Sequence, residues 1–363
     1  MHRREFFRVA AVASAATMTF PGRRALAWAA AGDGPWRTYE LTTRVEVPNA
    51  SGPVRVWVPV PLTVATGYQR PLGNTFTAEA GGTARLIDDK SRGFGFVSAA
   101  WPAGAAPRLS VVSRVQTRDV AVDLTNPRSH AAADKRFLRP SAYIPSDGIV
   151  RMTAEHVTRN AKTDVDKARA IYDWIVDNTF RDPTVRGCGI GDIKGMLETK
   201  NLGGKCADLN ALYVGLAHAS GLAARDVYGV RAAKSGLGYK SLGLSTDQAS
   251  KAQHCRAEVF LSGFGWVPVD PADVRKVVLE EPPGHLAMDS EPVQRARQRL
   301  FGSWEMNWIA YNFEHDVALP GRSGKPLPFL MYPQGETAAG ILDSLDPDTF
   351  KYSITAREIT SAS

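Results

Sequence analysis

The sequence predicts an α+β fold, and three observations lead to this prediction. Residues 32–123 show short alternating apolar and polar stretches between turn signals, as in the run from Pro53 to Pro61. From Asp164 onward, apolar residues repeat at helical spacing. After Gly221, alternation returns in stretches that begin near residues 224, 255 and 266. We therefore expect a small antiparallel β-sandwich, followed by helices that pack on a second antiparallel sheet.

These changes of pattern divide the 363 residues into five predicted segments. They are an export signal (1–31), an N-terminal β-sandwich (32–125), a linker with a first helix (126–160), a mixed core (161–280) and a C-terminal extension with terminal strands (281–363). Nothing in the sandwich looks catalytic. We therefore expect it to act as a scaffold or to position a substrate.

The N-terminus has the features of an export signal. Arg3 and Arg4 are followed by an aromatic pair and Arg8, and then by an apolar run from Val9 to Phe20. This run is too short to span a bilayer, and small residues around Ala29 offer a cleavage site. Paired arginines resemble a twin-arginine signal, and a general secretory signal is the alternative. Either signal predicts a periplasmic or extracellular protein.

The net charge of +7 does not indicate nucleic-acid binding. The first 24 residues hold five arginines against one glutamate, and the remaining positive charge is spread without a dense basic run. A nucleic-acid surface would concentrate its lysines and arginines. No later stretch is long and apolar enough for a membrane helix. We therefore expect no nucleic-acid partner and no integral membrane segment once the signal is removed.

Cys206 lies where a glycine pair leads into a predicted helix. Residues 209–216 carry an apolar stripe at helical spacing, and Gly221 suits the position just after the helix end. Free backbone N–H groups in the first turn, the helix dipole and Lys205 all favour a thiolate. The same N–H groups can stabilise an oxyanion. For this position alone, a buried cysteine with a packing role is the alternative.

A predicted hairpin brings His254 and Asp270 together. Two alternating runs, 254–261 and 266–270, flank a turn at residues 262–265. Matching their apolar faces places His254 and Asp270 on the opposite face, at the open end of the hairpin. A carboxylate there fixes the imidazole tautomer and stabilises the imidazolium. The pattern thus predicts a base and an orienting acid to serve the cysteine.

Four segments together resemble the bacterial transglutaminase-like superfamily of papain-related cysteine enzymes. They are GKCAD at 204–208, GLAAR at 221–225, His254 with AEV at 257–259, and GWVPVDP at 265–271. The resemblance implies a core in which a helix with an N-terminal cysteine packs on an antiparallel sheet. It also implies Cys206 as nucleophile, His254 as base and Asp270 as orienting acid. Many members have an aromatic residue where this chain has Arg256, so we expect a basic rim residue there that alters substrate preference.

The oxyanion donor beyond the Cys206 backbone is not assigned by the sequence. Asn178 and Trp174 precede the cysteine at suitable separations, although Trp174 lies on an apolar helix stripe and fits the core better. Asp208 and Arg256 are further candidates for the pocket. A metal site built from the cysteines and His254 is an alternative, but no two of the cysteines have the short spacing of metal sites. We expect no cofactor and no metal.

Cys188 and Cys255 form a candidate disulfide. Three cysteines in an oxidising compartment suggest one bridge and one free thiol, and a bridge between these two leaves Cys206 free to react. Glycines at 187, 189 and 191 predict a loop around Cys188 that can approach the sheet. A bridge requires the two Cα atoms to lie within about 7 Å.

The sequence therefore predicts acyl transfer through a thioester on Cys206. Hydrolysis of a peptide or related amide, in the cell envelope, is the first expectation. An amine-accepting transglutaminase or acyltransferase is the alternative within this chemistry. A non-catalytic envelope binding or scaffold module on the same fold is the alternative from another class.

We expect replacement of Arg3 and Arg4 by lysine to block export, because the twin-arginine route reads the arginine pair. Fractionation of cells that express the tagged protein tests this expectation, and N-terminal sequencing of the exported form should place the mature start between Trp28 and Gly32. Unchanged export would instead indicate the general secretory route.

Overall fold

Two antiparallel sheets pack face to face in the computed structural model, which describes residues 34–128 and 132–359. The first sheet has the strand order β19-β1-β6-β3. Its members are β1 (Arg37–Glu46), β3 (Gln69–Ala78), β6 (Arg108–Thr117) and β19 (Lys351–Ile359). The strands form because apolar residues alternate with polar ones, so that one face of the sheet is buried.

The second sheet of the sandwich has the order β18-β17-β2-β5-β4. Its members are β2 (Val54–Pro59), β4 (Thr83–Asp89), β5 (Phe94–Trp101), β17 (Gln334–Thr337) and β18 (Gly340–Leu342). Strand β2 is buried on both faces. Its valines point into the sandwich core, whereas Trp57 packs on the other side with Val317.

The core of the sandwich contains residues from both ends of the chain. Val45 and Val111 of the first sheet and Val56 of the second lie in one buried cluster with Phe350, which immediately precedes β19. Strand β19 pairs with β1 along nine consecutive residue pairs, from Thr38 opposite Ile359 to Glu46 opposite Lys351. The C-terminal segment therefore completes both sheets that the N-terminal segment begins.

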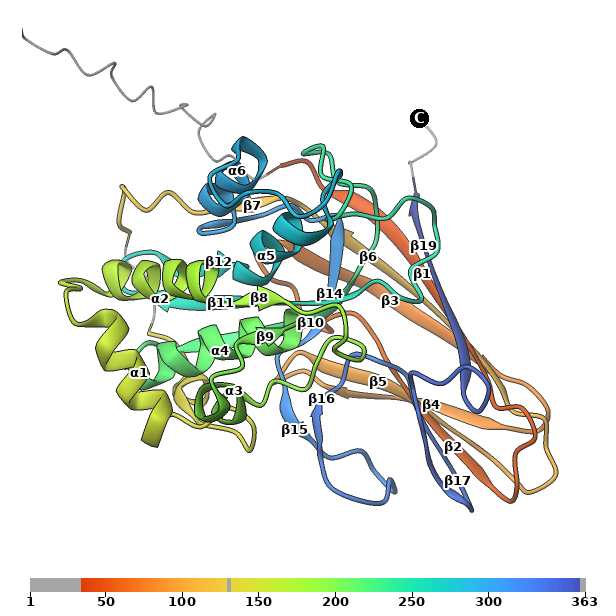
Figure 1. Cartoon of the computed structure of the whole chain (residues 1–363). Helices are drawn as coiled ribbons and strands as arrows, with labels where there is room; N and C mark the ends of the chain where they lie inside the picture. Colours follow the sequence, from red (N-terminus) through yellow and green to blue (C-terminus); the bar gives the residue numbers. More distant parts are fainter. Residues whose placement is uncertain (1–33, 129–131, 360–363) are drawn as a thin grey trace, which may run out of the picture. The chain divides into compact units, whose positions relative to one another are not determined.

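A helix packed on a third antiparallel sheet follows the sandwich in sequence (Figure 1). The helix is α4 (Cys206–Ala219), and twelve of its fourteen residues are buried, so it is a central helix rather than a surface one. The sheet has the order β12-β11-β10-β14. Its strands are β10 (Ala224–Arg231), β11 (Gln253–Leu261), β12 (Gly265–Val269) and β14 (Trp308–Asn312).

Five further helices complete this part, and four of them contact α4. The four are α1 (Gly148–Thr158), α2 (Asp164–Asn178), α3 (Ile193–Thr199) and α5 (Pro271–Glu280), and α6 (Glu291–Arg299) packs on α5. Helix α2 begins where the sequence predicts because Thr163 and Asp166 form a reciprocal capping box. The apolar stripes of these helices surround α4 and hold it against the sheet.

Short elements connect these layers. They are β7 (Val120–Ala121), the 3₁₀ helix η1 (Lys135–Leu138), β8 (Phe180–Arg181), β9 (Gly203–Gly204), β13 (Ser303–Trp304), β15 (His315–Val317) and β16 (Leu327–Phe329). The pair β8–β9 is parallel and leads directly into α4.

The α+β class predicted from the sequence is confirmed. Helix α4 ends just before Gly221, whose φ of +81° is the left-handed conformation expected after a helix end. The hairpin register is also confirmed, because Val259 lies opposite Val267 and Ala257 opposite Val269. Matching the apolar faces was sufficient to predict this register, because a shift of the strand pairing by one residue would turn every buried side chain outward.

The predicted export signal, residues 1–31, lies outside the described residues. Within residues 34–128 and 132–359, no helix has both the length and the apolar character needed to cross a membrane. The predicted segment boundaries at 125, 160 and 280 stay predictions. Residues 281–363 supply β14 to the helix-bearing sheet and β17, β18 and β19 to the sandwich.

We expect Phe350→Ala to lower the free energy of unfolding by about 3–5 kcal/mol, because it empties a fully buried aromatic site in the sandwich core. Ile341→Ala is the matched control on the neighbouring strand β18, where the side chain is exposed and the cost should stay within about 0.5 kcal/mol. Urea denaturation followed by tryptophan fluorescence measures both. Equal costs would contradict a structural role for the C-terminal segment.

Candidate active site

Cys206 occupies the first position of α4, and its loop is fixed by Asp208 two residues later. The Asp208 carboxylate accepts hydrogen bonds from the backbone N–H groups of Lys205 at 2.9 Å, Ile190 at 3.0 Å and Gly191 at 2.9 Å. A carboxylate in the first turn also suits the positive end of the helix dipole. Asp208 therefore caps the start of α4 and is not among the residues that line the cavity.

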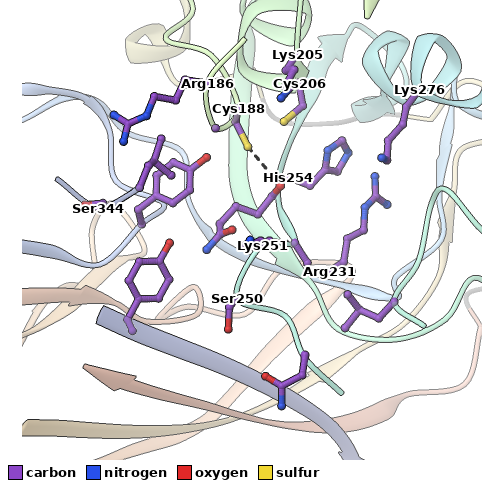
Figure 2. A pocket seen from close by; sticks show the side chains of 18 of the residues that line it. Arg186, Cys188, Lys205, Cys206, Arg231, Ser250, Lys251, His254, Lys276 and Ser344 are labelled. Atoms are coloured by element: carbon purple, nitrogen blue, oxygen red, sulfur yellow. Dashed lines mark hydrogen bonds between the residues drawn. The ribbon is translucent and has the colours of Figure 1, made fainter. Parts of the chain in front are cut away.

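His254 lies at the start of β11 and faces the beginning of α4. Its Nε2 atom is 2.8 Å from Oδ2 of Asp270, the residue that caps α5. This contact leaves Nδ1 available to the thiol of Cys206, which lines the same cavity as His254. Figure 2 shows Cys206 and His254 side by side at the cavity. The structure thus brings together the three residues that the sequence selected.

The Asp270 carboxylate is held in place by neighbours other than the histidine. Its Oδ1 atom accepts the backbone N–H of Asp273 at 3.0 Å and the side-chain amide of Asn210 at 3.3 Å. Asn210 lies one helical turn after Cys206 and also donates to the carbonyl of Cys255 at 2.8 Å. These contacts join α4, β11 and α5 around one buried carboxylate.

Asp273 is a site residue that the sequence analysis missed. Its Oδ2 atom lies 3.3 Å from Nε2 of His254, and its Oδ1 atom accepts a hydrogen bond from Arg231 at 2.6 Å. The available signal was the spacing of Asp270, Pro271 and Asp273, which is typical of a helix start with an acidic first turn. Asp273 ties the histidine to an arginine of β10.

The Cys206 thiol and the His254 ring open into a cavity of about 680 Å³. Most of its lining comes from the loop around Cys188, the segment 241–254 and the C-terminal residues 344–352. Tyr332 and Tyr352, the latter on strand β19 of the sandwich, also line the cavity. The nucleophile candidate is therefore reachable even though its side chain is almost wholly buried.

Comparison with known proteins gives a consistent result. The family model of the transglutaminase-like superfamily matches residues 151–271, which contain all three candidate residues. A Haemophilus influenzae protein described as uncharacterized is 33% identical over 343 residues, covering 89% of this chain and 90% of that protein. The chain belongs to the transglutaminase-like superfamily.

The fold agrees with this family. The crystal structure of a candidate cysteine protease from Cytophaga hutchinsonii superposes with a TM-score of 0.54 at 15% sequence identity. The match covers 90% of this chain and 99% of that one, so it includes the sandwich as well as the transglutaminase-like core. The likeness confirms the predicted transglutaminase-like fold with its preceding sandwich.

Buried carboxylates determine the protonation state of His254. Burial alone would lower the pKa of His254, but the charges of Asp273 and Asp270 outweigh it and raise this pKa to about 9. Burial also raises the pKa of Asp273, but Arg231 and His254 hold it below its usual value. His254 is therefore an imidazolium at neutral pH, and Asp273 stays ionised.

The three cysteines form one cluster of free thiols. Hydrogen bonds from Cys188 and then Cys255, together with His254, overcome the effect of burial and hold the pKa of Cys206 well below its usual value. The pKa values of Cys188 and Cys255 are both raised, the first mainly by Cys206 and the second mainly by burial. Cys188 donates to the carbonyl of Gln253 at 3.4 Å and lies in the same buried cluster as Cys255, and a bridge between the two cysteines stays a prediction.

Arg256 does not lie at the rim of the cavity, where the sequence analysis expected it. Its side chain is buried behind Asp270, with Nε 3.6 Å from Oδ2 of that residue. It donates to the carbonyl of Glu305 at 2.9 Å and lies over the rings of Trp304 and Trp308. The predicted rim position of Arg256 was wrong because these tryptophans cover the face of β11 that carries the even-numbered residues after His254.

Asn178 and Trp174 also lie away from the cavity lining. Asn178 is exposed at the end of α2, where its side chain donates to the carbonyl of Trp174 at 2.8 Å. Trp174 packs against the helical core, as its apolar stripe indicated. Neither side chain is placed to stabilise an oxyanion.

His254, Asp270 and Asp273 are also the residues that could hold a metal ion, since their ligand atoms lie within 4.8 Å of one another. Each carboxylate already faces an arginine, Arg231 for Asp273 and Arg256 for Asp270. These fixed positive charges already neutralise the carboxylates that a metal ion would bind, which favours an ion-pair network over a metal centre.

We expect a limiting dose of iodoacetamide to alkylate Cys206 before Cys188 or Cys255. The rate at Cys206 should also fall less steeply from about pH 8 to about pH 6 than the rate of an ordinary thiol, which slows about tenfold per pH unit in that range. The reason is the lowered pKa, because the thiolate fraction falls only when the pH drops through that value. Peptide mapping by mass spectrometry after timed labelling measures both quantities.

His254→Gln is the informative companion variant for this experiment, because it removes the imidazolium and should restore a steeper pH dependence at Cys206. Faster labelling of Cys188 or Cys255 in the unmodified protein would contradict the assignment.

Proposed function

We propose that this chain is a thiol-dependent acyl-transfer enzyme that hydrolyses a peptide or related amide. The observation that supports this most directly is that Cys206 and His254 meet at one cavity, while Asp270 holds the histidine through a 2.8 Å contact between its carboxylate and Nε2. A cysteine with a purely structural role would not require an imidazolium beside it. An imidazolium with a purely structural role would likewise not require a thiolate.

In the first step, the Cys206 thiolate attacks the amide carbonyl carbon and forms the C–S bond. The negative charge that develops on the carbonyl oxygen meets the backbone N–H of Cys206 at the start of α4, where a helix leaves its N–H groups unpaired. The N–H of Ala207 is not available for this purpose, because it donates to the carbonyl of Cys188 at 2.9 Å.

In the second step, His254 transfers its Nδ1 proton to the leaving amine while the C–N bond breaks, which leaves a thioester. The neutral imidazole then removes a proton from water, which attacks the thioester and frees the acid product. Asp270 and Asp273 hold Nε2 throughout, so the ring keeps its orientation when its charge changes.

The charge of the cavity favours water over a protein amine as the acceptor. The lining residues include six lysines and arginines and no aspartate or glutamate. A lysine side chain arriving as acceptor would be protonated and repelled by these cations. This supports hydrolysis over amine-accepting transglutamination, and an intact Cys–His–Asp arrangement argues against a non-catalytic module.

The predicted export signal gives this activity its location. An exported chain would meet peptides or related amides of the cell envelope in the periplasm or outside the cell. This location rests on residues 1–31, which lie outside the described residues.

We expect Cys206→Ser to abolish hydrolysis in a screen of fluorogenic peptide amides, and Asp270→Asn to lower kcat by about 10²-fold. The loss of kcat in Asp270→Asn should be smaller than in an enzyme whose histidine contacts a single carboxylate, because Asp273 also faces Nε2. Asp134→Asn, at an exposed carboxylate far along the chain, is the control and should keep full activity. Retained hydrolysis in Cys206→Ser would refute the proposal, and a mass increase on Cys206 after rapid quenching would identify the thioester.

A further inference from the structure

The cavity beside Cys206 carries an unusual excess of positive charge. Its lining residues include six cations, and none of the lining residues is an aspartate or glutamate. The six are Arg181, Arg186, Lys205, Arg231, Lys251 and Lys276. A cavity of one sign with partly apolar walls focuses its field on whatever enters.

Three carboxylates outside the lining pair with four of these six cations and offset half of their charge. Glu280 serves both Arg181 and Lys276, and Asp273 serves Arg231. Arg186 pairs with Asp343 at 2.7 Å in a solvent-exposed position. Lys205 and Lys251 have no ion-pair partner among residues 34–128 and 132–359. The cavity therefore keeps net positive charge after all its internal pairs are counted.

Three of the cations form a compact group that we call the basic subsite: Arg181, Arg231 and Lys276. Their side chains are only 14%, 6% and 16% exposed. They come from three elements, since Arg181 ends β8, Arg231 ends β10 and Lys276 lies on α5. Grouping buried like charges is costly, because each is desolvated and repelled by the others.

The cost is visible at Lys276. Burial, followed by the charges of Arg181 and Arg231, lowers the pKa of its ammonium, and the pairing with Glu280 does not cancel these effects. An anion that enters the cavity would relieve both the repulsion and the desolvation. Figure 2 shows Lys276 and Arg231 facing each other on the His254 side of Cys206, whereas Arg186 lies on the opposite side beside Cys188.

We propose that the basic subsite binds a carboxylate on the amine side of the scissile bond, so that the substrate is a short peptide or related amide whose leaving part ends in, or carries, a carboxylate. This inference rests on the proposed function, in which His254 protonates the leaving amine. The leaving part must then lie against His254, and Lys276 and Arg231 of the subsite lie beyond that ring (Figure 2). The amine released would be an amino acid or a short peptide with a free carboxyl end.

A purely structural role for the three cations is the competing explanation, in which Glu280 and Asp273 absorb their charge and none acts on a ligand. The two explanations differ in the electrostatic potential that a small anion meets at Cys206. Iodoacetate and iodoacetamide measure this potential, because in both the Cys206 sulfur displaces iodide and forms a C–S bond, and the principal difference is the charge of the reagent.

We expect the ratio of alkylation rates at Cys206, iodoacetate over iodoacetamide, to exceed the ratio for free cysteine by about tenfold at low salt and to fall as salt is added. Lys276→Gln should lower the ratio several-fold. Glu280→Gln should raise the ratio, because Arg181 and Lys276 then lose the carboxylate that offsets their charge. General damage to the fold would not change the ratio in opposite directions in these two variants. Lys194→Gln is the matched control. It removes the lysine of another i,i+4 ion pair, the one with Glu198 on α3, which lies outside the cavity lining, and it should leave the ratio unchanged.

A second experiment tests the amine-side placement. It uses acetyl-capped alanine tetrapeptides that end in a free carboxylate or in a carboxamide, and a third that carries its only carboxylate as an N-terminal succinyl group. We expect the protein to cleave the free-carboxylate peptide with at least about tenfold higher kcat/KM than the carboxamide, mostly through KM, and Lys276→Gln to narrow this difference. Arg181→Gln is the second variant, should Lys276→Gln fold poorly.

The outcomes separate the two proposals. If Lys276→Gln and Glu280→Gln leave the alkylation ratio unchanged, or if the succinyl peptide is preferred, the basic subsite is refuted while hydrolysis by Cys206 stands. If the ratio responds as expected but no peptide is cleaved, the proposed hydrolysis fails. Binding of the free-carboxylate peptide to Cys206→Ala, measured by calorimetry and weakened by Lys276→Gln, would then still support the subsite.

Discussion

Asp270 is fully buried, and its carboxylate serves two structural tasks at once. It caps α5 by accepting the N–H of Asp273, and it accepts the Nε2 proton of His254 at 2.8 Å. The first task fixes where α5 begins, and the second fixes the orientation of the imidazole. Because one group performs both, the helix start and the histidine ring hold a constant relation to each other. The side chain of Asn210 adds α4, and with it Cys206, to the same frame.

The charges around Asp270 depend on one another. His254, Asp273, Arg231 and Arg256 are all at most 5% exposed, so each would be a buried unpaired ion without its neighbours. Removal of one member of such a network leaves an opposite charge uncompensated, at a cost of about 3–5 kcal/mol. The arrangement is therefore rigid, and rigidity is what a thiolate–imidazolium pair needs to stay aligned. One end of the network, Arg231, reaches the cavity, so the groups that hold the histidine also set the charge that a substrate meets.

The sandwich and the C-terminal segment contribute to the site at a distance from the chemistry. Strands β17, β18 and β19 complete its two sheets, and the chain around them supplies Leu345, Phe350 and Tyr352 to one wall of the cavity. Cys206 also shares a buried cluster with Tyr39 of β1 and Ile354 of β19. The cavity is consequently formed by residues that are far apart in the chain and meet only when the sandwich has assembled.

The sequence by itself determined the local parts of this protein. Helix α4 with Cys206 at its start, the hairpin that pairs Val259 with Val267, and the pairing of His254 with Asp270 all follow from periodicity and turn residues over short stretches. Only the tertiary structure decided the rest. It placed Arg256 under two tryptophans from residues 304–308, brought Asp273 to the histidine, and gathered Arg181, Arg231 and Lys276 from three elements. Periodicity tells which face of an element is buried, but the partners on that face are set by long-range packing, which a single sequence does not encode locally.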